Sequence, residues 1–438
     1  MHILIICQYF PPENKIGAVR PSKLAKYLNR YENTDVSVLT VEPIEGGSLN
    51  LMDDYYGAAV YRAAVPPFVK KLNRFLKRRT GTESASTISK DYSSTNKSRN
   101  GGLTHQVRKL MFSARESVLD IAYYLGAKRI LNSIGCKFDV VISTYNTEFG
   151  HKVGLWYKKR HPEIRWITDY RDPLCGSYST VKQRKHGTKF VRRVTNSCDA
   201  ITVVAKGISD IHREDFGNKP VYVIPNGYDS EDPVPTAAES ADSIVRIVYT
   251  GELYNGKRDL TPLLRAISEL EKQKKIGSED IEVVYAGKSG DSFFSQISRF
   301  PGIKSSCLGF VSREKALTLQ SGADILLLAS WCEPNDKEVL TGKFFEYLQM
   351  KKPIVCIISG RASGCALTRI INEHSLGLSY EAVNEETDYK LLCSYIDKQV
   401  SAKKQFGHAE FVGDDEYVSG FDYKTIAERF YRILNYYD

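Results

Sequence analysis

The sequence predicts an α/β protein built from two doubly wound parallel-sheet domains that face each other across a cleft. First, short apolar runs typical of buried parallel strands alternate with segments of helical periodicity in both halves of the chain. Second, residues 230–243 are rich in acidic residues, Pro and Ala and have the composition of a linker. Third, 438 residues with 42% hydrophobic side chains suffice for two or three domain cores.

Composition limits the class of protein. The nine cysteines are odd in number and include no Cys-x-x-Cys pair, which indicates neither a disulfide framework nor a zinc site and favours a reducing cytosol. We expect no signal peptide, because the apolar run His2–Cys7 is too short for one and no basic segment precedes it. We expect no membrane span, because no apolar run approaches the ~18 residues that a span needs. The net charge of +9 requires an anionic partner. The sequence has no recognition-helix motif or aromatic-interleaved basic patch, so we expect no nucleic acid.

The first domain is expected to span 1–229. Helices are predicted from the loop after the first strand to Arg30, over His105–Ile134 and over Thr147–Arg160. Residues 80–102, rich in Ser, Thr, Asn and Gly, are predicted to form a mobile loop. The predicted strands are His2–Cys7, Asp35–Val41, Ala58–Val65, Phe138–Ser143, Ile164–Asp169, Asp199–Val204 and Pro220–Pro225.

The second domain is expected to span 244–421. Ser312 is the predicted N-cap of a helix over Arg313–Gln320. Further helices are predicted after Leu260, from about Thr341, and over Arg361–Asn372 and Asp388–Lys404. The predicted strands are Ile244–Thr250, Ile281–Ala286, Ser305–Phe310, Asp324–Ala329 and a strand that begins at Ile354.

A basic segment at 62–79 contains no acidic residue. Apolar residues recur in it at helical spacing, opposite the Lys and Arg side chains, which is the pattern of a helix lying on an anionic membrane surface. The alternative is a solvated basic loop beside a core helix. The predicted membrane-binding residues are Phe68, Lys70, Lys71, Leu72, Arg74, Phe75, Lys77 and Arg78.

The turn before the helix at 341 has the chemistry of a phosphate site. Ligands of parallel sheets bind at the carboxyl ends of the strands, and a helix N-terminus favours an anion. Thr341, Gly342 and Lys343 supply a possible cap, room for close approach and a cation. Glu338 and Glu346 bracket this turn and offer acceptors for hydroxyl groups. The alternative is an amphipathic helix with packed aromatic residues and solvated acids.

Two further loops of the second domain contribute to this prediction. The loop that starts at Gly251 carries Lys257 and Arg258 just before a helix, where Arg can hold a pyrophosphate by a bidentate fork and Lys as a point charge. Without an anion, a basic pair at a helix start is electrostatically unfavourable. Gly287 stands in the turn after the next predicted strand.

Charged residues also mark the first domain. Asp169-Tyr-Arg-Asp-Pro173 follows a predicted parallel strand, so its charges are expected on the rim of the cleft. The alternative is an ion pair of Arg171 with Asp172 that only orders a loop. Gly17 stands in the loop after the first strand, where it can bring backbone N–H groups close to a diphosphate or serve as a plain turn.

The donor-side motif resembles a known family. Glu338 and Glu346 with seven residues between them, and Gly-Lys-Phe-Phe-Glu-Tyr-Leu at 342–348, resemble the donor-site signature of family 4 retaining glycosyltransferases, which have the GT-B fold of two Rossmann-like domains. The segments 169–173 and 9–12 are also similar to this family. Two positions depart from it: Glu252 stands where an Arg is usual, and Gly17-Ala18 where a Gly pair is usual.

The resemblance implies a retaining transfer from a UDP- or GDP-sugar to a hydroxyl of a growing glycan or polyprenyl-diphosphate-linked saccharide. It implies a hexosyl- or N-acetylhexosaminyltransferase of bacterial cell-surface polysaccharide synthesis. Such a protein is expected to be cytoplasmic, peripheral on the inner face of the plasma membrane, with its last helix, 422–438, packed back on the first domain. We expect no required cofactor or metal, since no Asp-x-Asp motif stands at a strand end.

The resemblance also implies roles for individual residues. The implied catalytic residues are Arg258, Lys343, Glu338 and Asp172. The implied donor-binding residues are Gly17, Gly251, Lys257, Arg258, Gly287, Thr341, Gly342, Lys343 and Glu346. The implied acceptor-binding residues are Arg20, His151, Asp169, Arg171 and Asp172. For His151, a packed histidine on an amphipathic helix is the alternative.

Two other functions stay open at this point. One is a non-hydrolysing sugar-nucleotide epimerase on the same fold, which needs a His and acidic residues grouped in the cleft. The other is a catalytically silent partner that binds a sugar nucleotide or lipid carrier, which the departure at Glu252 makes conceivable.

Overall fold

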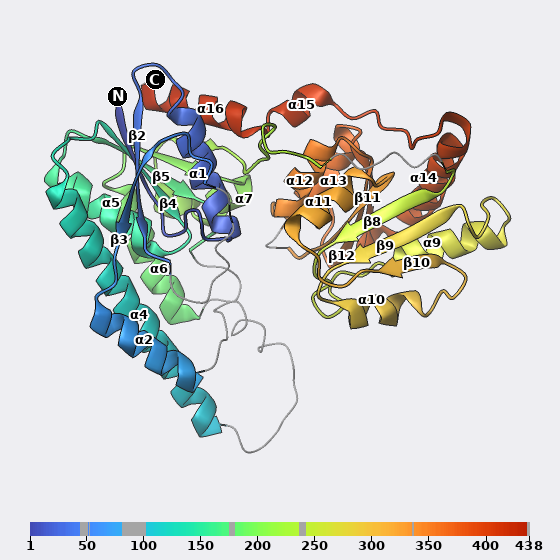
Figure 1. Cartoon of the computed structure of the whole chain (residues 1–438), viewed down its shortest axis with the longest axis horizontal. Helices are drawn as coiled ribbons and strands as arrows, with labels where there is room; N and C mark the ends of the chain where they lie inside the picture. The colour runs from blue at the N-terminus through green and yellow to red at the C-terminus, as the bar shows by residue number, and fades with distance from the viewer. Residues whose placement is uncertain are drawn as a thin grey trace. The chain divides into compact units, whose positions relative to one another are not determined.

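The computed structural model describes residues 1–43, 51, 53–80, 102–174, 180–235, 242–334 and 337–435 (Figure 1). The side chains of residues 73, 74, 76–80 and 102–116 lie outside this description, as does 81–101 of the loop predicted at 80–102. The chain forms two compact units. Unit 1 comprises Met1–Ile224 with Ala427–Asp438, and unit 2 comprises Pro225–Ile426.

Unit 1 contains a seven-stranded sheet in the order β3-β2-β1-β4-β5-β6-β7, in which every paired strand is parallel. Its five inner strands are largely buried, which explains their continuous apolar sequences, whereas the two edge strands are only partly buried. The strands are β1 (His2–Ile6), β2 (Asp35–Val41), β3 (Ala59–Ala63), β4 (Val140–Tyr145), β5 (Arg165–Tyr170), β6 (Ala200–Val203) and β7 (Val221–Val223).

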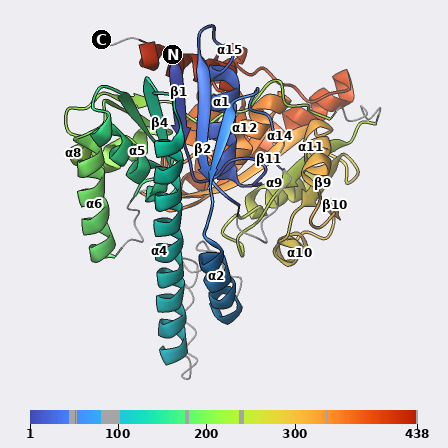
Figure 2. The ribbon, with the colours of Figure 1, turned by 60° about the vertical axis from the view of Figure 1, so that its left-hand side comes forward.

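Helices cover both faces of this sheet. Side chains from α2, α4, α5 and α6 pack with Leu4 and Ile6 of β1 on one face. The helices of unit 1 are α1 (Ile16–Leu28), α2 (Pro67–Thr80), α4 (Gly102–Ser133), α5 (Glu148–Arg160), α6 (Val181–Thr195), α7 (Lys206–Ile211) and α8 (Arg213–Phe216). Helices α2, α4 and α6 extend beyond the sheet in the same direction (Figures 1 and 2).

The last helix, α16 (Tyr423–Asn435), lies mostly in unit 1. The ring of Tyr431 stacks on Tyr31 with centroids 4.0 Å apart, and Arg165 donates a hydrogen bond of 2.7 Å to the carbonyl of Leu434. Phe430 is fully buried. The apolar face of α16 from Ala427 to Leu434 is therefore buried.

Unit 2 contains a six-stranded parallel sheet in the order β10-β9-β8-β11-β12-β13. The strands are β8 (Val245–Thr250), β9 (Ile281–Ala286), β10 (Lys304–Cys307), β11 (Ile325–Cys332), β12 (Ile354–Gly360) and β13 (Gly377–Glu381). Both sheets are thus doubly wound, so the predicted fold class is confirmed.

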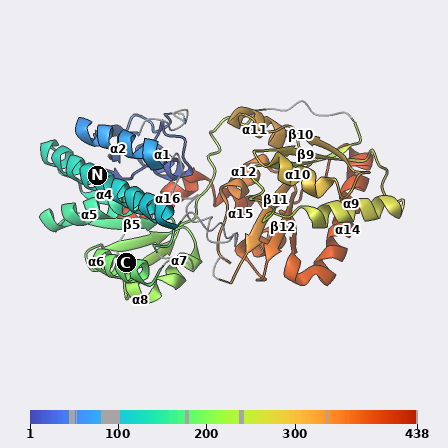
Figure 3. The same ribbon diagram turned by 90° about the horizontal axis from the view of Figure 1, so that it is seen from below.

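Helices also cover both faces of the sheet in unit 2. Residues of α9, α10 and α14 pack on one face, where α9 lies beside α14 (Figure 3). Residues of α12 and α13 pack on the other. The helices are α9 (Thr261–Lys272), α10 (Gly290–Ile297), α11 (Arg313–Ser321), α12 (Gly342–Met350), α13 (Ala366–Glu373), the 3₁₀-helix η2 (Ala382–Asn384), α14 (Glu385–Phe406) and α15 (Asp415–Ser419).

Several elements differ from the sequence-based prediction. Helix α1 begins at Ile16, so Gly17 lies in its first turn instead of the preceding loop. Helices α6, α7, α8 and α10 and strand β13 were not predicted. The Ser312 cap of α11 is confirmed, because its hydroxyl accepts a hydrogen bond of 3.2 Å from the N–H of Lys315.

Candidate functional site

The donor-side residues of unit 2 lie where the strand order of the sheet reverses. Strands β8 and β11 are neighbours, although the chain first moves away from β8 through β9 and β10. The connections after β8 and β11 therefore leave in opposite directions at their carboxyl ends, which is the usual ligand position in doubly wound sheets. Gly251 directly follows β8, and the segment from Glu333 to Thr341 follows β11.

Two glycines permit close packing at this point. Gly251 has a φ of 140°, and a β-carbon there would lie 2.3 Å from Cε of Lys343. A β-carbon on Gly287 would lie 2.0 Å from the carbonyl oxygen of Gly251. That same oxygen accepts a hydrogen bond of 2.8 Å from the hydroxyl of Tyr285. Lys343 therefore rests against backbone that only glycine allows.

Lys343 is a partly buried cation whose side chain has no ion-pair partner within the described residues. It is the second residue of α12, and in the part of the chain that the structure describes it forms no hydrogen bond or ion pair. Burial lowers the pKa of Lys343; Glu346 opposes this shift, while Arg258 and Arg313 reinforce it. Three positive side chains and a helix N-terminus thus converge on one place, an arrangement that favours a bound anion.

Thr341 and Gly342 complete the start of α12. Thr341 occupies the N-cap position, but its side chain does not cap the helix, and its buried hydroxyl oxygen has no hydrogen-bond partner among the described residues. Gly342 is exposed and leaves the first turn open. The N–H of Phe344 donates a hydrogen bond of 3.0 Å to the carbonyl oxygen of Thr341. The N–H groups of Gly342 and Lys343 donate no bond to the cap side chain and remain available to a ligand.

Arg258 is nine-tenths buried and held in a fixed orientation. Its Nη1 donates hydrogen bonds of 3.0 Å to the hydroxyl of Tyr249 and to the carbonyl oxygen of Glu252. Its guanidinium lies over the rings of Tyr254 and Trp331, at 4.6 and 5.6 Å from their centroids. The unusual Glu252 thus anchors Arg258 through its backbone.

The remaining donor-side residues differ in their surroundings. Lys257 is exposed, and its carbonyl oxygen accepts a hydrogen bond of 2.5 Å from Ser359. Glu346 accepts hydrogen bonds of 2.9 Å from Arg313 and 3.4 Å from Gln320.

Glu338 is held by an arginine from the following helix. Arg369 of α13 donates bonds of 2.9 and 3.0 Å to its two carboxylate oxygens. Glu338 and Glu346 are therefore each oriented by an arginine that the sequence analysis did not single out. Both lie more than thirty positions from their carboxylate, so sequence spacing gave no signal for either pair.

In unit 1, Arg20 and Asp169, which were predicted to bind the acceptor, form a buried ion pair. Both are fully buried, and Arg20 donates to the two carboxylate oxygens of Asp169 at 3.0 and 2.9 Å and to the carbonyl of Ile224 at 2.9 Å. Thr144 and Thr202 also donate to Asp169. Burial alone raises the pKa of Asp169, but Arg20 and Thr202 hold it below its ordinary value. The pair stabilises the unit.

His151, also predicted at the acceptor site, is packed inside unit 1. The ring is fully buried, and its Nδ1 lies 2.8 Å from the hydroxyl oxygen of Ser143, which also accepts a bond of 2.9 Å from Trp166. Burial lowers the pKa of His151 to about 3, although the charge of Asp169 opposes this shift. The imidazole is therefore neutral and enclosed, as in the packed alternative.

Arg171 and Gly17 position the start of α1 and offer no free ligand groups. Arg171 is nine-tenths buried and donates to the carbonyl oxygens of Gly17 at 2.7 Å and Ile16 at 3.2 Å. A β-carbon on Gly17 would lie 2.8 Å from the ring of Tyr9 and 2.9 Å from the amide of Asn146. This glycine is thus explained by packing, and the expected close approach of a diphosphate is not needed to account for it.

Asp172 is the acceptor-side residue that remains accessible. Asp172 is exposed, and its carboxylate forms no hydrogen bond or ion pair within the described part of the chain. Desolvation raises the pKa of Asp172 above its ordinary value, although Arg171 opposes this shift. Asp172 is the second residue after β5, at the carboxyl edge of the sheet.

The predicted membrane segment forms α2. Phe68, Leu72 and Phe75 expose 72%, 40% and 51% of their surface, and Lys70 and Lys71 are exposed. Lys70 forms an ion pair of 2.6 Å with Glu42. The side chains of Arg74, Lys77 and Arg78 lie outside the described residues. Of the helices that the structure describes, none has the length and hydrophobicity needed to cross a bilayer.

A second basic helix, α6, escaped the sequence analysis. Its signal was available: Thr180 and Gln183 form a reciprocal capping box at its start. Phe190, Val191 and Val194 then recur at helical spacing and are buried.

Comparisons with known proteins agree with this fold. Residues 88–232, a third of the chain, match Glycosyltransferase Family 4. Among curated proteins, none matches the sequence. Among solved structures, the chain is similar to the N-terminal domain of Candida albicans trehalose-6-phosphate phosphatase, with 10% identity, a TM-score of 0.61, and coverage of 99% of this chain and 96% of that chain.

Two further solved structures are similar over nearly their whole length. The lipopolysaccharide outer core galactosyltransferase WaaB has 9% identity, a TM-score of 0.55 and 99% coverage of both chains. The UDP-forming α,α-trehalose-phosphate synthase of Burkholderia xenovorans has 9% identity, a TM-score of 0.58, and coverage of 99% of this chain and 98% of that chain.

These likenesses define the fold as GT-B. The match to Glycosyltransferase Family 4 at 88–232 agrees with the resemblance seen in the sequence for that part of the chain.

Proposed function

We propose that the protein is a retaining glycosyltransferase that moves a hexosyl or N-acetylhexosaminyl group from a UDP- or GDP-sugar. The proposed acceptor is a hydroxyl of a growing glycan or polyprenyl-diphosphate-linked saccharide of bacterial cell-surface polysaccharide synthesis. The proposed place of action is the cytoplasmic face of the plasma membrane, where the protein is peripheral.

The observation that carries the donor part is the unneutralised cation at Lys343. A partly buried ammonium without an ion-pair partner is unfavourable. Arg258 and Arg313 add to the positive potential around it, and Glu346, which pairs with Arg313, offsets part of that potential. A diphosphate would relieve this and accept bonds from the first N–H groups of α12. The printed name of the Burkholderia xenovorans enzyme, UDP-forming, supports a nucleotide donor for a chain of this fold.

The proposed chemistry follows from charge development. When the sugar leaves, negative charge grows on the diphosphate, and Lys343 and Arg258 stabilise it from fixed positions without reorganisation. Glu346 and Glu338, oriented by Arg313 and Arg369, are the proposed acceptors for ribose and sugar hydroxyl groups.

Asp172 is the proposed group that orients the acceptor. Its carboxylate is exposed and unpaired within the described residues, so it can accept a bond from the attacking hydroxyl. The hydroxyl proton then passes to the departing phosphate. Arg20, His151 and Asp169 have no part in this step, because they are buried.

A screen of UDP- and GDP-sugars by thermal shift tests the donor assignment, since a ligand that binds only the folded state raises the melting temperature. We expect one base to stabilise the wild type and the shift to shrink in Lys343→Met. Product analysis by NMR in excess EDTA then tests the reaction. A product that keeps the donor's anomeric configuration supports the proposal. An inverted product contradicts it, and binding without turnover favours the catalytically silent alternative.

A further inference from the structure

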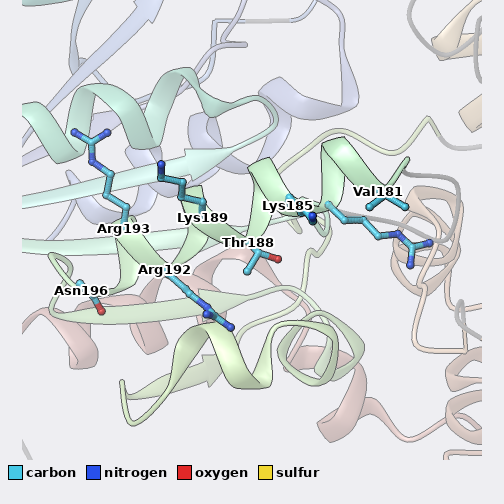
Figure 4. A pocket seen from close by; sticks show the side chains of 8 residues that line it. Val181, Lys185, Thr188, Lys189, Arg192, Arg193 and Asn196 are labelled. Atoms are coloured by element: carbon cyan, nitrogen blue, oxygen red, sulfur yellow. The ribbon is translucent and has the colours of Figure 1, made fainter.

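The exposed face of α6 forms a continuous basic groove (Figure 4). The groove has a volume of about 690 Å³, and all of its lining residues belong to α6 or to the residue that follows it. They recur three or four positions apart, so they share one face of the helix. The lining residues are Val181, Arg184, Lys185, Thr188, Lys189, Arg192, Arg193 and Asn196.

Of the five cations that line this face, Arg184 and Arg192 have partners, and the side chains of the other three have none among the described residues. Helix α6 contains no acidic residue. Arg192 pairs with Asp215 at 2.8 Å. Lys185, Lys189 and Arg193 are exposed and have no hydrogen-bond or ion-pair partner within the described ranges. They stand four positions apart, so their charges follow one another along successive turns.

Core packing does not explain these cations. The opposite face of α6, with Phe190, Val191 and Val194, is buried against unit 1 and already anchors the helix. On the basic face only Val181 offers exposed apolar surface, and no aromatic ring interleaves the cations. The face thus lacks both a hydrophobic anchor for a folded protein partner and a stacking platform for single-stranded nucleic acid. It suits a surface of negative charge.

We propose that the α6 groove is a second, purely electrostatic contact with an anionic phospholipid surface. The proposal rests on the peripheral membrane location proposed above and deepens it. Helices α2 and α6 belong to the same unit and extend beyond its sheet in the same direction (Figures 1 and 2). Helix α2 exposes Phe68 and Phe75, which can enter the lipid interface, whereas α6 supplies charge without apolar insertion.

The test compares two triple variants of the full chain with matched charge. One is Lys185→Glu, Lys189→Glu, Arg193→Glu on the α6 face. The control is Lys272→Glu, Lys275→Glu, Lys390→Glu, which lowers the net charge equally but lies in unit 2, on exposed positions without a partner among the described residues. Binding is measured to phosphatidylcholine vesicles with and without phosphatidylglycerol, over a range of salt concentrations. Melting temperatures confirm that both variants fold.

We expect the α6 variant to bind phosphatidylglycerol vesicles with an affinity at least about tenfold lower than that of the wild type, and with a shallower salt dependence. The control variant should bind like the wild type. Equal binding by all three proteins overturns the proposal. Equal losses in both variants also overturn it, because net charge alone then explains the effect. Binding of soluble tripolyphosphate is measured for the same proteins. If the α6 variant loses affinity for tripolyphosphate but binds vesicles like the wild type, the proposal is overturned in favour of a soluble phosphate ligand. Sugar-nucleotide binding, measured separately, tests the donor assignment independently.

Discussion

The side chain of Lys343 lies so close to Gly251 that a β-carbon at position 251 would stand 2.3 Å from Cε and 3.0 Å from Nζ. This contact joins the loop after β8 to the start of α12, the two connections that leave the sheet at its switch point. The glycine thereby sets where the ammonium stands. Donor affinity is therefore expected to depend on both residues together.

Replacing Gly251 by Ala should weaken nucleoside diphosphate binding by displacing Lys343. The φ of 140° adds backbone strain, so the free energy of unfolding should also fall, by about 1–3 kcal/mol. A double-mutant cycle with Lys343→Ala, measured by calorimetric titration, separates the two effects. We expect Gly251→Ala to cost much less binding energy when Lys343 is already absent. Additive losses would contradict the link. Gly256→Ala is the control, because its φ is also positive but a β-carbon there meets open space.

Replacing Lys343 or Arg258 by Ala should each weaken nucleoside diphosphate binding by about 1.5–3 kcal/mol, the usual worth of hydrogen bonds to charged groups. Lys351→Ala is a matched control, since Lys351 caps the other end of α12 and pairs with Asp415 at the surface. Unchanged affinity in both Lys343→Ala and Arg258→Ala would remove the proposed diphosphate site from unit 2.

The lowered pKa of Lys343 predicts a pH dependence of donor binding. In the free protein the ammonium loses its proton as pH rises through a value below the ordinary 10.5, and a bound anion raises that pKa again. The affinity for the donor diphosphate should therefore fall at a pH below that at which an exposed lysine loses its proton. Between the lowered pKa and 10.5 the unfolded chain holds more protons, so stability should rise with pH there. Titrations of wild type and Lys343→Met should differ, and identical profiles would contradict this assignment.

Much of the fold was predictable because its determinants are local. Buried parallel strands have continuous apolar sequences, and Asp35–Val41 and Ile281–Ala286 were predicted with the bounds that β2 and β9 have. The position of Lys343 in the first turn of a helix was predictable for the same reason, since a few consecutive residues indicate both the helix start and the cation. Helix α6 carried equally local signals, its capping box and apolar spacing, which the sequence analysis did not use.

What was not predictable depends on distant pairing. Asp169 and Arg20 are 149 positions apart in the chain, and only the folded sheet shows that they neutralise each other in the core. A charged motif at a strand end therefore gave the same sequence signal whether its side chains faced a ligand or a buried partner. Asp172 and Asp169 illustrate this, since they are three residues apart, and only Asp172 is exposed.

Replacing Asp172 by Asn should lower kcat by about tenfold to a hundredfold without changing donor affinity, because the residue is proposed to orient only the acceptor. Donor binding by titration and turnover with a saccharide acceptor separate the two quantities. Asp169→Asn makes an instructive comparison: it leaves Arg20 buried without its full countercharge, so it should reduce stability by several kcal/mol. Loss of donor affinity in a stably folded Asp172→Asn variant would contradict the acceptor role.

The apolar face of α2 should determine the salt-resistant part of membrane binding. Phe68, Leu72 and Phe75 are exposed although burial of each would be favourable by about 1.5–3 kcal/mol, and a lipid interface can supply that burial. The triple change to Ser should abolish vesicle binding at high salt, where charge is screened, and spare donor binding. Leu391 and Phe406, exposed on α14 of unit 2, provide the control when replaced by Ser. Vesicle binding by the α2 variant at the wild-type level in high salt would show that α2 does not enter the lipid interface.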